Sequence, residues 1–185
     1  LKAHNYTAIS LDDVVAAKQG RRILPENAFL LTFDDGYKSF YSHVLPLLEQ
    51  YNYPAVVALV GKWLQTPVGE NVSYGGKDIK PRGFFMSLEE IKTISQSPLI
   101  EIASHSHDLH RGIPANPQGN TQPAAISFQY FGQEKNYEDK ARYRQLMVLS
   151  VPYPTKLLNP LDINCSLPLR AESIQWRQAL RSNAF

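Results

Sequence analysis

An uninterrupted apolar run constrains the fold of this chain more than any other feature. Residues 55–60 read Ala-Val-Val-Ala-Leu-Val and follow directly after Pro54. A strand with one face in solvent alternates apolar and polar residues, so an unbroken run of this length predicts a strand that is buried on both faces. Strands of this kind belong to parallel sheets covered by helices. The run therefore predicts an α/β protein.

Helix signals alternate with strand signals along the chain. Residues 39–51 carry apolar side chains at helical spacing, although a proline at position 46 is expected to kink this helix. Two serine capping patterns predict helices over residues 11–18 and 87–96. Further strands are predicted over residues 28–33 and 100–104. This alternation indicates βα units.

The remaining segments are predicted to be less regular. Residues 61–85 are rich in glycine, proline and polar residues and are expected to form a loop. Its aromatic rings either stack on sugar faces or pack beneath the loop; these are Trp63, Tyr74, Phe84 and Phe85. Residues 111–122 are predicted to be an irregular connection, residues 134–147 a helix, and residues 171–180 a short amphipathic segment.

The predicted strand at residues 28–33 ends in two adjacent carboxylates. Asp34 and Asp35 follow it directly, and Gly36 then allows a turn. Reacting groups in α/β folds lie at the carboxyl ends of strands. Neighbouring residues that leave a strand point in different directions, so one carboxylate can bind a metal while the other faces water or substrate. The alternative is a helix N-cap, for which aspartate is also favoured.

A histidine cluster follows the predicted strand at residues 100–104. The sequence continues as His105-Ser106-His107-Asp108-Leu109-His110. Imidazole is the commonest protein ligand for transition metals, and two histidines with one carboxylate leave positions open for water and substrate. A solvated polar turn is the alternative. The coincidence with the acidic doublet favours a metal site.

Together the two motifs resemble those of the polysaccharide deacetylases (NodB homology, carbohydrate esterase family 4). The resemblance implies that Asp34 is the catalytic base and that Asp35, His105 and His110 bind one divalent metal ion. Zinc is expected, with nickel, cobalt or iron as alternatives. His110 follows His105 by five residues rather than the usual four, which is similar to the branch that de-N-acetylates the biofilm polymer poly-β-1,6-N-acetyl-D-glucosamine. His107 is the rival ligand.

The resemblance also implies a fold and a setting. The fold expected is an irregular (β/α) barrel, incomplete at both ends, with a partial deacetylase domain at residues 1–147. Residues 148–185 have no clear match, and the general acid histidine of the branch has no counterpart in this sequence. The expected activity is hydrolysis of N-acetyl groups from an N-acetylglucosamine polymer, weak for this segment alone. The expected location is extracytoplasmic: the periplasm, the outer membrane or the cell surface.

Two other functions stay open at this point. A metal-dependent phosphoesterase could use the acidic doublet, but it would need a second metal and more carboxylates than either motif offers. A carbohydrate-binding module with a degenerate site would hold metal without turnover. Composition argues against other classes: the formal net charge is only +2 with no long basic run, so a nucleic-acid partner is not expected. The chain as given has no segment of about 20 apolar residues that could span a membrane, and its single cysteine, Cys165, excludes an internal disulfide.

Overall fold

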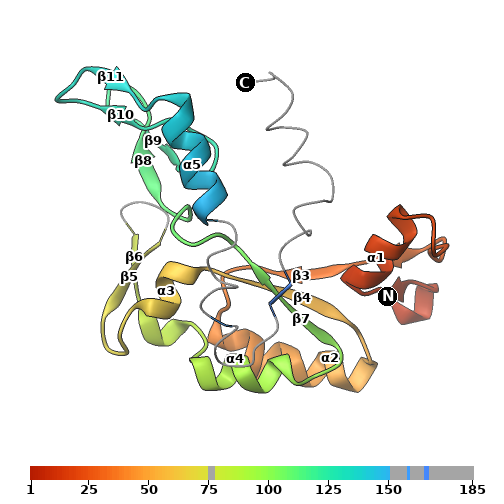
Figure 1. Ribbon diagram of the computed structural model, residues 1–185. Coiled ribbons are helices and arrows are strands. Elements are labelled where there is room, and N and C mark those ends of the chain that lie inside the picture. Colours follow the sequence, from red (N-terminus) through yellow and green to blue (C-terminus); the bar gives the residue numbers. More distant parts are fainter. Residues whose placement is uncertain (75–77, 151–157, 159–164, 167–185) are drawn as a thin grey trace.

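A parallel sheet forms the centre of the molecule. The computed structural model describes residues 1–74, 78–150, 158 and 165–166. Within them, four strands form one sheet in the order β12-β7-β4-β3, and each neighbouring pair is parallel (Figure 1). These strands are β3 (Leu31–Phe33), β4 (Ala55–Leu59), β7 (Ile100–Ser104) and β12 (Cys165–Ser166). The predicted α/β class is confirmed, but closure into a barrel is not seen among the described residues.

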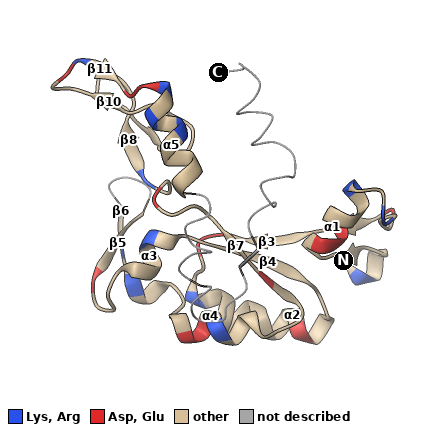
Figure 2. Cartoon of the chain, viewed as in Figure 1, with Lys and Arg blue, Asp and Glu red and all other residues tan. Residues whose placement is uncertain are grey.

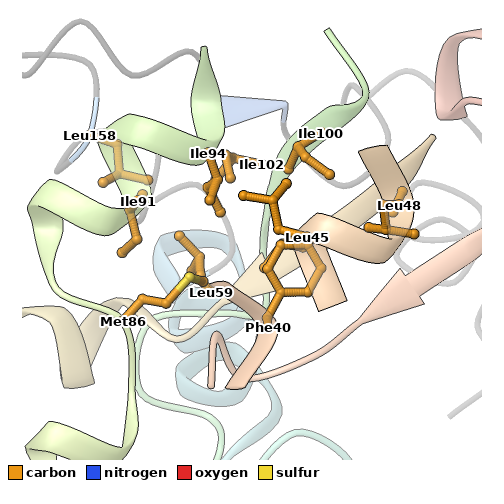
Figure 3. Packing of buried hydrophobic residues seen from close by; sticks show 12 residues of the cluster. Phe40, Leu45, Leu48, Leu59, Met86, Ile91, Ile94, Ile100, Ile102 and Leu158 are labelled. Atoms are coloured by element: carbon orange, nitrogen blue, oxygen red, sulfur yellow. The ribbon is translucent and has the colours of Figure 1, made fainter. Parts of the chain in front are cut away.

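Two helices cover one face of this sheet. They are α2 (Leu45–Tyr51) and α4 (Leu88–Ser95), which both lie below the strands in Figure 1. The main hydrophobic core lies between these helices and the sheet (Figure 3). The unbroken run of β4 is accounted for, because four of its five residues are buried. Figure 2 shows both charge signs on α4, as its sequence Leu-Glu-Glu-Ile-Lys requires.

Shorter elements surround this framework. In chain order they are η1 (Lys2–His4), β1 (Thr7–Ala8), α1 (Leu11–Lys18), β2 (Ala28–Phe29), η2 (Phe40–Val44), α3 (Gly61–Gln65), β5 (Asn71–Tyr74), β6 (Asp78–Pro81), η3 (Arg82–Phe84), β8 (Gly112–Pro114), β9 (Thr121–Pro123), β10 (Tyr130–Phe131), β11 (Asn136–Tyr137) and α5 (Lys140–Ser150). No helix in the described part of the chain is long and apolar enough to cross a membrane.

The helix starts agree with the capping patterns. Ser10 Oγ accepts a hydrogen bond from the Asp13 amide at 3.1 Å where α1 begins. Ser87 Oγ accepts one from the Glu90 amide, also at 3.1 Å, where α4 begins. In both helices the acidic side chain in turn accepts a hydrogen bond from the serine amide. Amides at the start of a helix have no carbonyl partner within it, and these two bonds provide partners for them. The two predicted helices are confirmed.

Two predicted elements are divided in the structure. The strand predicted over residues 28–33 is split at Leu30: β2 pairs with β1, and β3 pairs with β4. The helix predicted over residues 39–51 begins as a π-helix, η2, and becomes α-helical at Leu45. Pro46 lies at this junction and has no amide hydrogen to donate, which interrupts the regular α-helical bonding as expected.

Two segments predicted to be irregular and the predicted start of one helix are wrong. Residues 61–85 form α3, an antiparallel β5–β6 hairpin and η3 rather than a loop. Residues 111–122 include most of a β8–β9 hairpin. The helix predicted over residues 134–147 begins only at Lys140, because β10 pairs with β11 just before it. Elements of two to five residues are too short to produce a periodic sequence signal. The segment predicted at residues 171–180 lies outside the described residues.

Candidate active site

The carboxyl end of β3 turns sharply at the acidic doublet. Asp35 and Gly36 both have φ of 72°, a left-handed backbone conformation. A Cβ atom on Gly36 would lie 2.5 Å from Leu59 Cδ2, so the Leu59 side chain would have to shift, and the left-handed φ independently favours glycine. The turn buries the side chain of Asp35, which is 9% exposed. Asp34 is exposed to solvent.

The carboxyl end of β7 carries the histidines on a curled loop. The His105 amide donates to the Leu59 carbonyl at 2.8 Å, which continues the pairing of β7 with β4. Ser106 then adopts φ of 72° and its Oγ accepts from the Leu109 amide at 3.3 Å. Leu109 is buried and anchors the far side of the loop. The His105 and His110 rings are thereby brought to 5.3 Å between centroids.

The start of α3 holds this loop in place. The Gly61 amide donates to the Ser106 carbonyl at 3.0 Å, and the Lys62 amide donates to the His107 carbonyl at 2.8 Å. These amides lie in the first turn of α3, where amide groups have no partner within the helix. The start of α3 therefore holds the histidine loop through two backbone hydrogen bonds.

One aspartate and two histidines converge between these strand ends. Asp35 Oδ1 lies 3.2 Å from His110 Nε2 and 3.7 Å from His105 Nε2. One possible ligand atom from each residue lies within 4.8 Å of the others, and the described residues contain one such group. Donor atoms around a tetrahedral zinc ion lie about 2.0–2.2 Å from the metal and so about 3.3–3.5 Å from one another. The 3.2 and 3.7 Å separations at Asp35 Oδ1 are close to this spacing.

The environment of Asp35 also fits a cation. Its Oδ1 is buried and has no hydrogen-bond partner among the described residues. A buried carboxylate oxygen left without a partner is costly unless it is paired with a charge or a metal. Asp35, His105 and His110 thus offer the donor set that a divalent metal requires, and three protein ligands leave a position open.

His107 does not join this group. Its amide donates to the Ser150 carbonyl at 2.8 Å, which directs the residue toward α5. Burial lowers the pKa of the His107 imidazole. Of the two ligand choices considered from the sequence, the geometry brings His105 and not His107 beside Asp35.

A wall of aromatic rings adjoins the metal-ligand candidates. Trp63 and Phe85 are each only 3% exposed, so they pack beneath the surface rather than face a sugar, whereas Phe84 is 56% exposed. Tyr74 Oη donates to Asp35 Oδ2 at 3.1 Å. The pKa of Tyr74 is raised by its hydrogen bond with Tyr37, by burial and by the Asp35 carboxylate, so its hydroxyl stays protonated. Sequence reasoning did not identify this contact, which joins residues 39 positions apart.

Two cavities open beside His110. One, of about 160 Å³, lies against Trp63 and the edge of β5. The other, of about 420 Å³, lies between the histidine loop and the β8–β9 hairpin. Both are lined by His110 and Arg111. The candidate metal site therefore borders space that a substrate could enter.

Comparisons with known proteins agree with this geometry. Residues 21–156 match the family model described as polysaccharide deacetylase. The chain is 37% identical over 158 residues to the poly-β-1,6-N-acetyl-D-glucosamine N-deacetylase of Escherichia coli K12, covering 85% of this chain and 23% of that protein.

Two solved structures are similar over most of this chain. The BpsB deacetylase domain from Bordetella bronchiseptica matches with a TM-score of 0.76 and 43% identity, covering 84% of this chain and 60% of that one. A de-N-acetylase from Aggregatibacter actinomycetemcomitans matches with a TM-score of 0.78 and 38% identity, covering 86% and 60%. The chain thus spans about a quarter of the Escherichia coli relative and three fifths of each solved chain.

Proposed function

The chain belongs to the polysaccharide deacetylase family, and on that premise we propose that it removes N-acetyl groups from poly-β-1,6-N-acetyl-D-glucosamine. The observation that carries the proposal is the convergence of Asp35, His105 and His110 at the strand ends, next to the exposed Asp34. The similarity to the Escherichia coli N-deacetylase supports the choice of polymer.

In the proposed reaction, Asp35, His105 and His110 hold one divalent ion, and zinc is the ion we propose. Such an ion supplies Lewis acidity, because it polarises a carbonyl and lowers the pKa of water towards about 7. Asp34 takes a proton from the attacking water as general base. The water oxygen bonds to the acetyl carbon, the carbon–nitrogen bond breaks, and the proton held by Asp34 passes to the leaving nitrogen. The products are a free amine and acetic acid, which ionises to acetate.

The surroundings of the site support this division of roles. Asp34 is exposed and can meet a water molecule and a polymer, whereas Asp35 is buried and meets two imidazoles. The cavity of about 420 Å³ between the histidine loop and the β8–β9 hairpin is lined by one of the proposed metal ligands, His110, and falls within the usual volume range of small-molecule pockets. We propose that a polymer unit lies there during hydrolysis.

We further propose that the parallel sheet is part of an irregular (β/α) barrel, and that residues 1–147 belong to the deacetylase domain. An extracytoplasmic location is proposed as well, because the polymer is an exopolysaccharide. The similarity to the Bordetella deacetylase domain supports the assignment of the domain. Residues 148–185 receive no function in this proposal.

The test separates the two members of the acidic doublet. Asp34→Asn should keep the metal but lose deacetylation of a β-1,6-linked N-acetylglucosamine oligomer, because an amide cannot accept the proton from water. Asp35→Asn should lose the metal itself. Asp12→Asn is a matched control, since Asp12 belongs to a second acidic doublet in the first turn of α1. Metal content and acetate release are measured together, and the reverse pattern at Asp34 and Asp35 would swap the proposed roles.

The histidines are tested by their metal content. His105→Ala and His110→Ala should each remove the ion, whereas His43→Ala should not, because His43 lies in η2 and is paired with Ser42. His107→Ala decides between the two ligand sets. A greater loss of metal in His107→Ala than in His105→Ala would refute the assignment of His105.

A further inference from the structure

Tyr74 lies outside the proposed ligand set and contacts two of its members. Its hydroxyl donates to Asp35 Oδ2 at 3.1 Å. Its ring lies 5.3 Å from the His110 ring between centroids, with a tilt of 38°. Tyr74 therefore meets two of the three residues proposed to hold the metal, although it comes from a hairpin and not from the central sheet.

The two oxygens of the Asp35 carboxylate have different surroundings. Oδ2 accepts the Tyr74 hydrogen bond, whereas Oδ1 faces His110 Nε2 at 3.2 Å and has no hydrogen-bond partner among the described residues. A carboxylate held at one oxygen by a neutral donor can rotate less about its terminal torsion. The bond from Tyr74 thus selects Oδ1 as the oxygen that points between the histidines.

The position of Tyr74 is itself fixed by several contacts. The Trp63 indole donates to the carbonyl of the preceding residue, Ser73, at 3.2 Å, which ties β5 to α3. The Lys80 ammonium lies 4.7 Å from the centre of the Tyr74 ring, on the partner strand β6. The Trp63 ring lies 5.5 Å from the Tyr74 ring. The hydroxyl is thus presented to Asp35 by a braced side chain.

From these contacts we infer that Tyr74 is a positioning residue for the metal site: it holds Asp35 so that Oδ1 alone faces the ion. The inference rests on the metal site of the proposed function and adds a residue to it. Partners that orient metal ligands typically change metal affinity by about 10–100-fold when they are removed. The same loss is expected in Tyr74→Phe, which removes the hydroxyl and keeps the ring.

The experiment compares two tyrosines that each lose one hydroxyl. Tyr143→Phe is the matched control, because Tyr143 Oη donates to the Ala125 carbonyl at 2.7 Å and not to Asp35. Zinc affinity is measured by competition with a chromophoric chelator, and the visible absorption of the Co²⁺-loaded protein reports ligand geometry. Thermal unfolding of the metal-free proteins shows whether either substitution disturbs the fold.

Tyr74→Phe should weaken zinc binding by about 10–100-fold and change the Co²⁺ spectrum, while Tyr143→Phe binds as the parent protein does. Parent-like zinc affinity in Tyr74→Phe would overturn the inference, and so would equal losses in both variants. Failure of the proposed function has a different signature: the parent protein would bind zinc, Tyr74→Phe would bind it more weakly, and no acetate would be released from the oligomer.

Discussion

The contact between Gly36 and Leu59 makes a quantitative prediction about the turn that carries the acidic doublet. In Gly36→Ala the new methyl group would stand 2.5 Å from Leu59 Cδ2. Leu59 is 1% exposed and belongs to the main core, so any shift of its side chain has to be taken up by its buried neighbours. The substitution should therefore destabilise the protein through the backbone and through the core together.

The two contributions can be estimated separately. A left-handed backbone conformation costs a residue with a Cβ about 1–2 kcal/mol. Forcing a methyl group into a packed core costs about a further 1–3 kcal/mol. Gly36→Ala should thus lower the free energy of unfolding by about 2–5 kcal/mol. Gly20→Ala has almost the same φ, 71° against 72°, but its new methyl group meets nothing within 4 Å. It should lose only the backbone part, about 1–2 kcal/mol.

Urea unfolding, followed by circular dichroism, measures both variants against the parent protein. Leu59→Val removes the obstructing Cδ2 atom, so the double variant with Gly36→Ala should lose less stability than the sum of the two single changes. Equal losses at Gly36 and Gly20 would refute the steric argument. Additive losses in the double variant would refute it independently.

Three further predictions concern ionisation, capping and metal binding. Burial raises the pKa of Glu101, whose carboxylate accepts from the Leu11 amide at 2.9 Å. Between the ordinary glutamate pKa of 4.5 and the raised pKa in the folded protein, the folded protein keeps this proton and the unfolded chain has lost it. The free energy of unfolding should therefore fall as the pH rises through this window. Glu101→Gln should flatten that part of the stability profile, and an unchanged profile would contradict the assignment. Ser87→Ala should cost about 1 kcal/mol in urea unfolding because α4 loses its cap, whereas Ser95→Ala, at the exposed end of the same helix, should cost less than half of that. Removing metal with a chelator should lower the melting temperature of the parent protein but not that of His110→Ala. If the free ion had been present at 1,000 times its dissociation constant, the parent protein should lose about 4 kcal/mol of its free energy of unfolding. Equal shifts in both proteins would contradict the proposed ligand set.

The sequence predicts those parts of the site that depend on local structure. The strand at residues 55–60 is identified by burial on both faces, and Asp35 and His105 are placed by following strands to their carboxyl ends. Parallel neighbours end at the same edge of a sheet, so two motifs that follow β3 and β7 lie close together once both flank β4. That inference needs no knowledge of side-chain contacts.

The remaining parts depend on contacts that no local pattern encodes. Tyr74 reaches Asp35 because an antiparallel hairpin folds back from α3, and the hairpin consists of two four-residue strands. Residues 61–85 contain glycine, proline and polar residues at the density typical of a loop, so the sequence pattern does not reveal the short elements in this segment. The choice between His105 and His107 likewise depends on how the loop turns at the left-handed Ser106, and the spacing of the histidines in the sequence does not encode that turn.

The left-handed backbone at Asp35 connects the conformation of the turn with its chemistry. Aspartate and asparagine adopt this conformation more readily than other residues with a Cβ. Aspartate at position 35 can therefore both adopt the φ of 72° and provide a carboxylate to the candidate metal site. Asparagine has the same shape as aspartate and also adopts the left-handed conformation readily. A loss of metal in Asp35→Asn would therefore be due to the loss of the carboxylate charge. Asp35→Ala would add about 1–2 kcal/mol of backbone cost to the lost ligand, and its metal loss could not be assigned to charge alone.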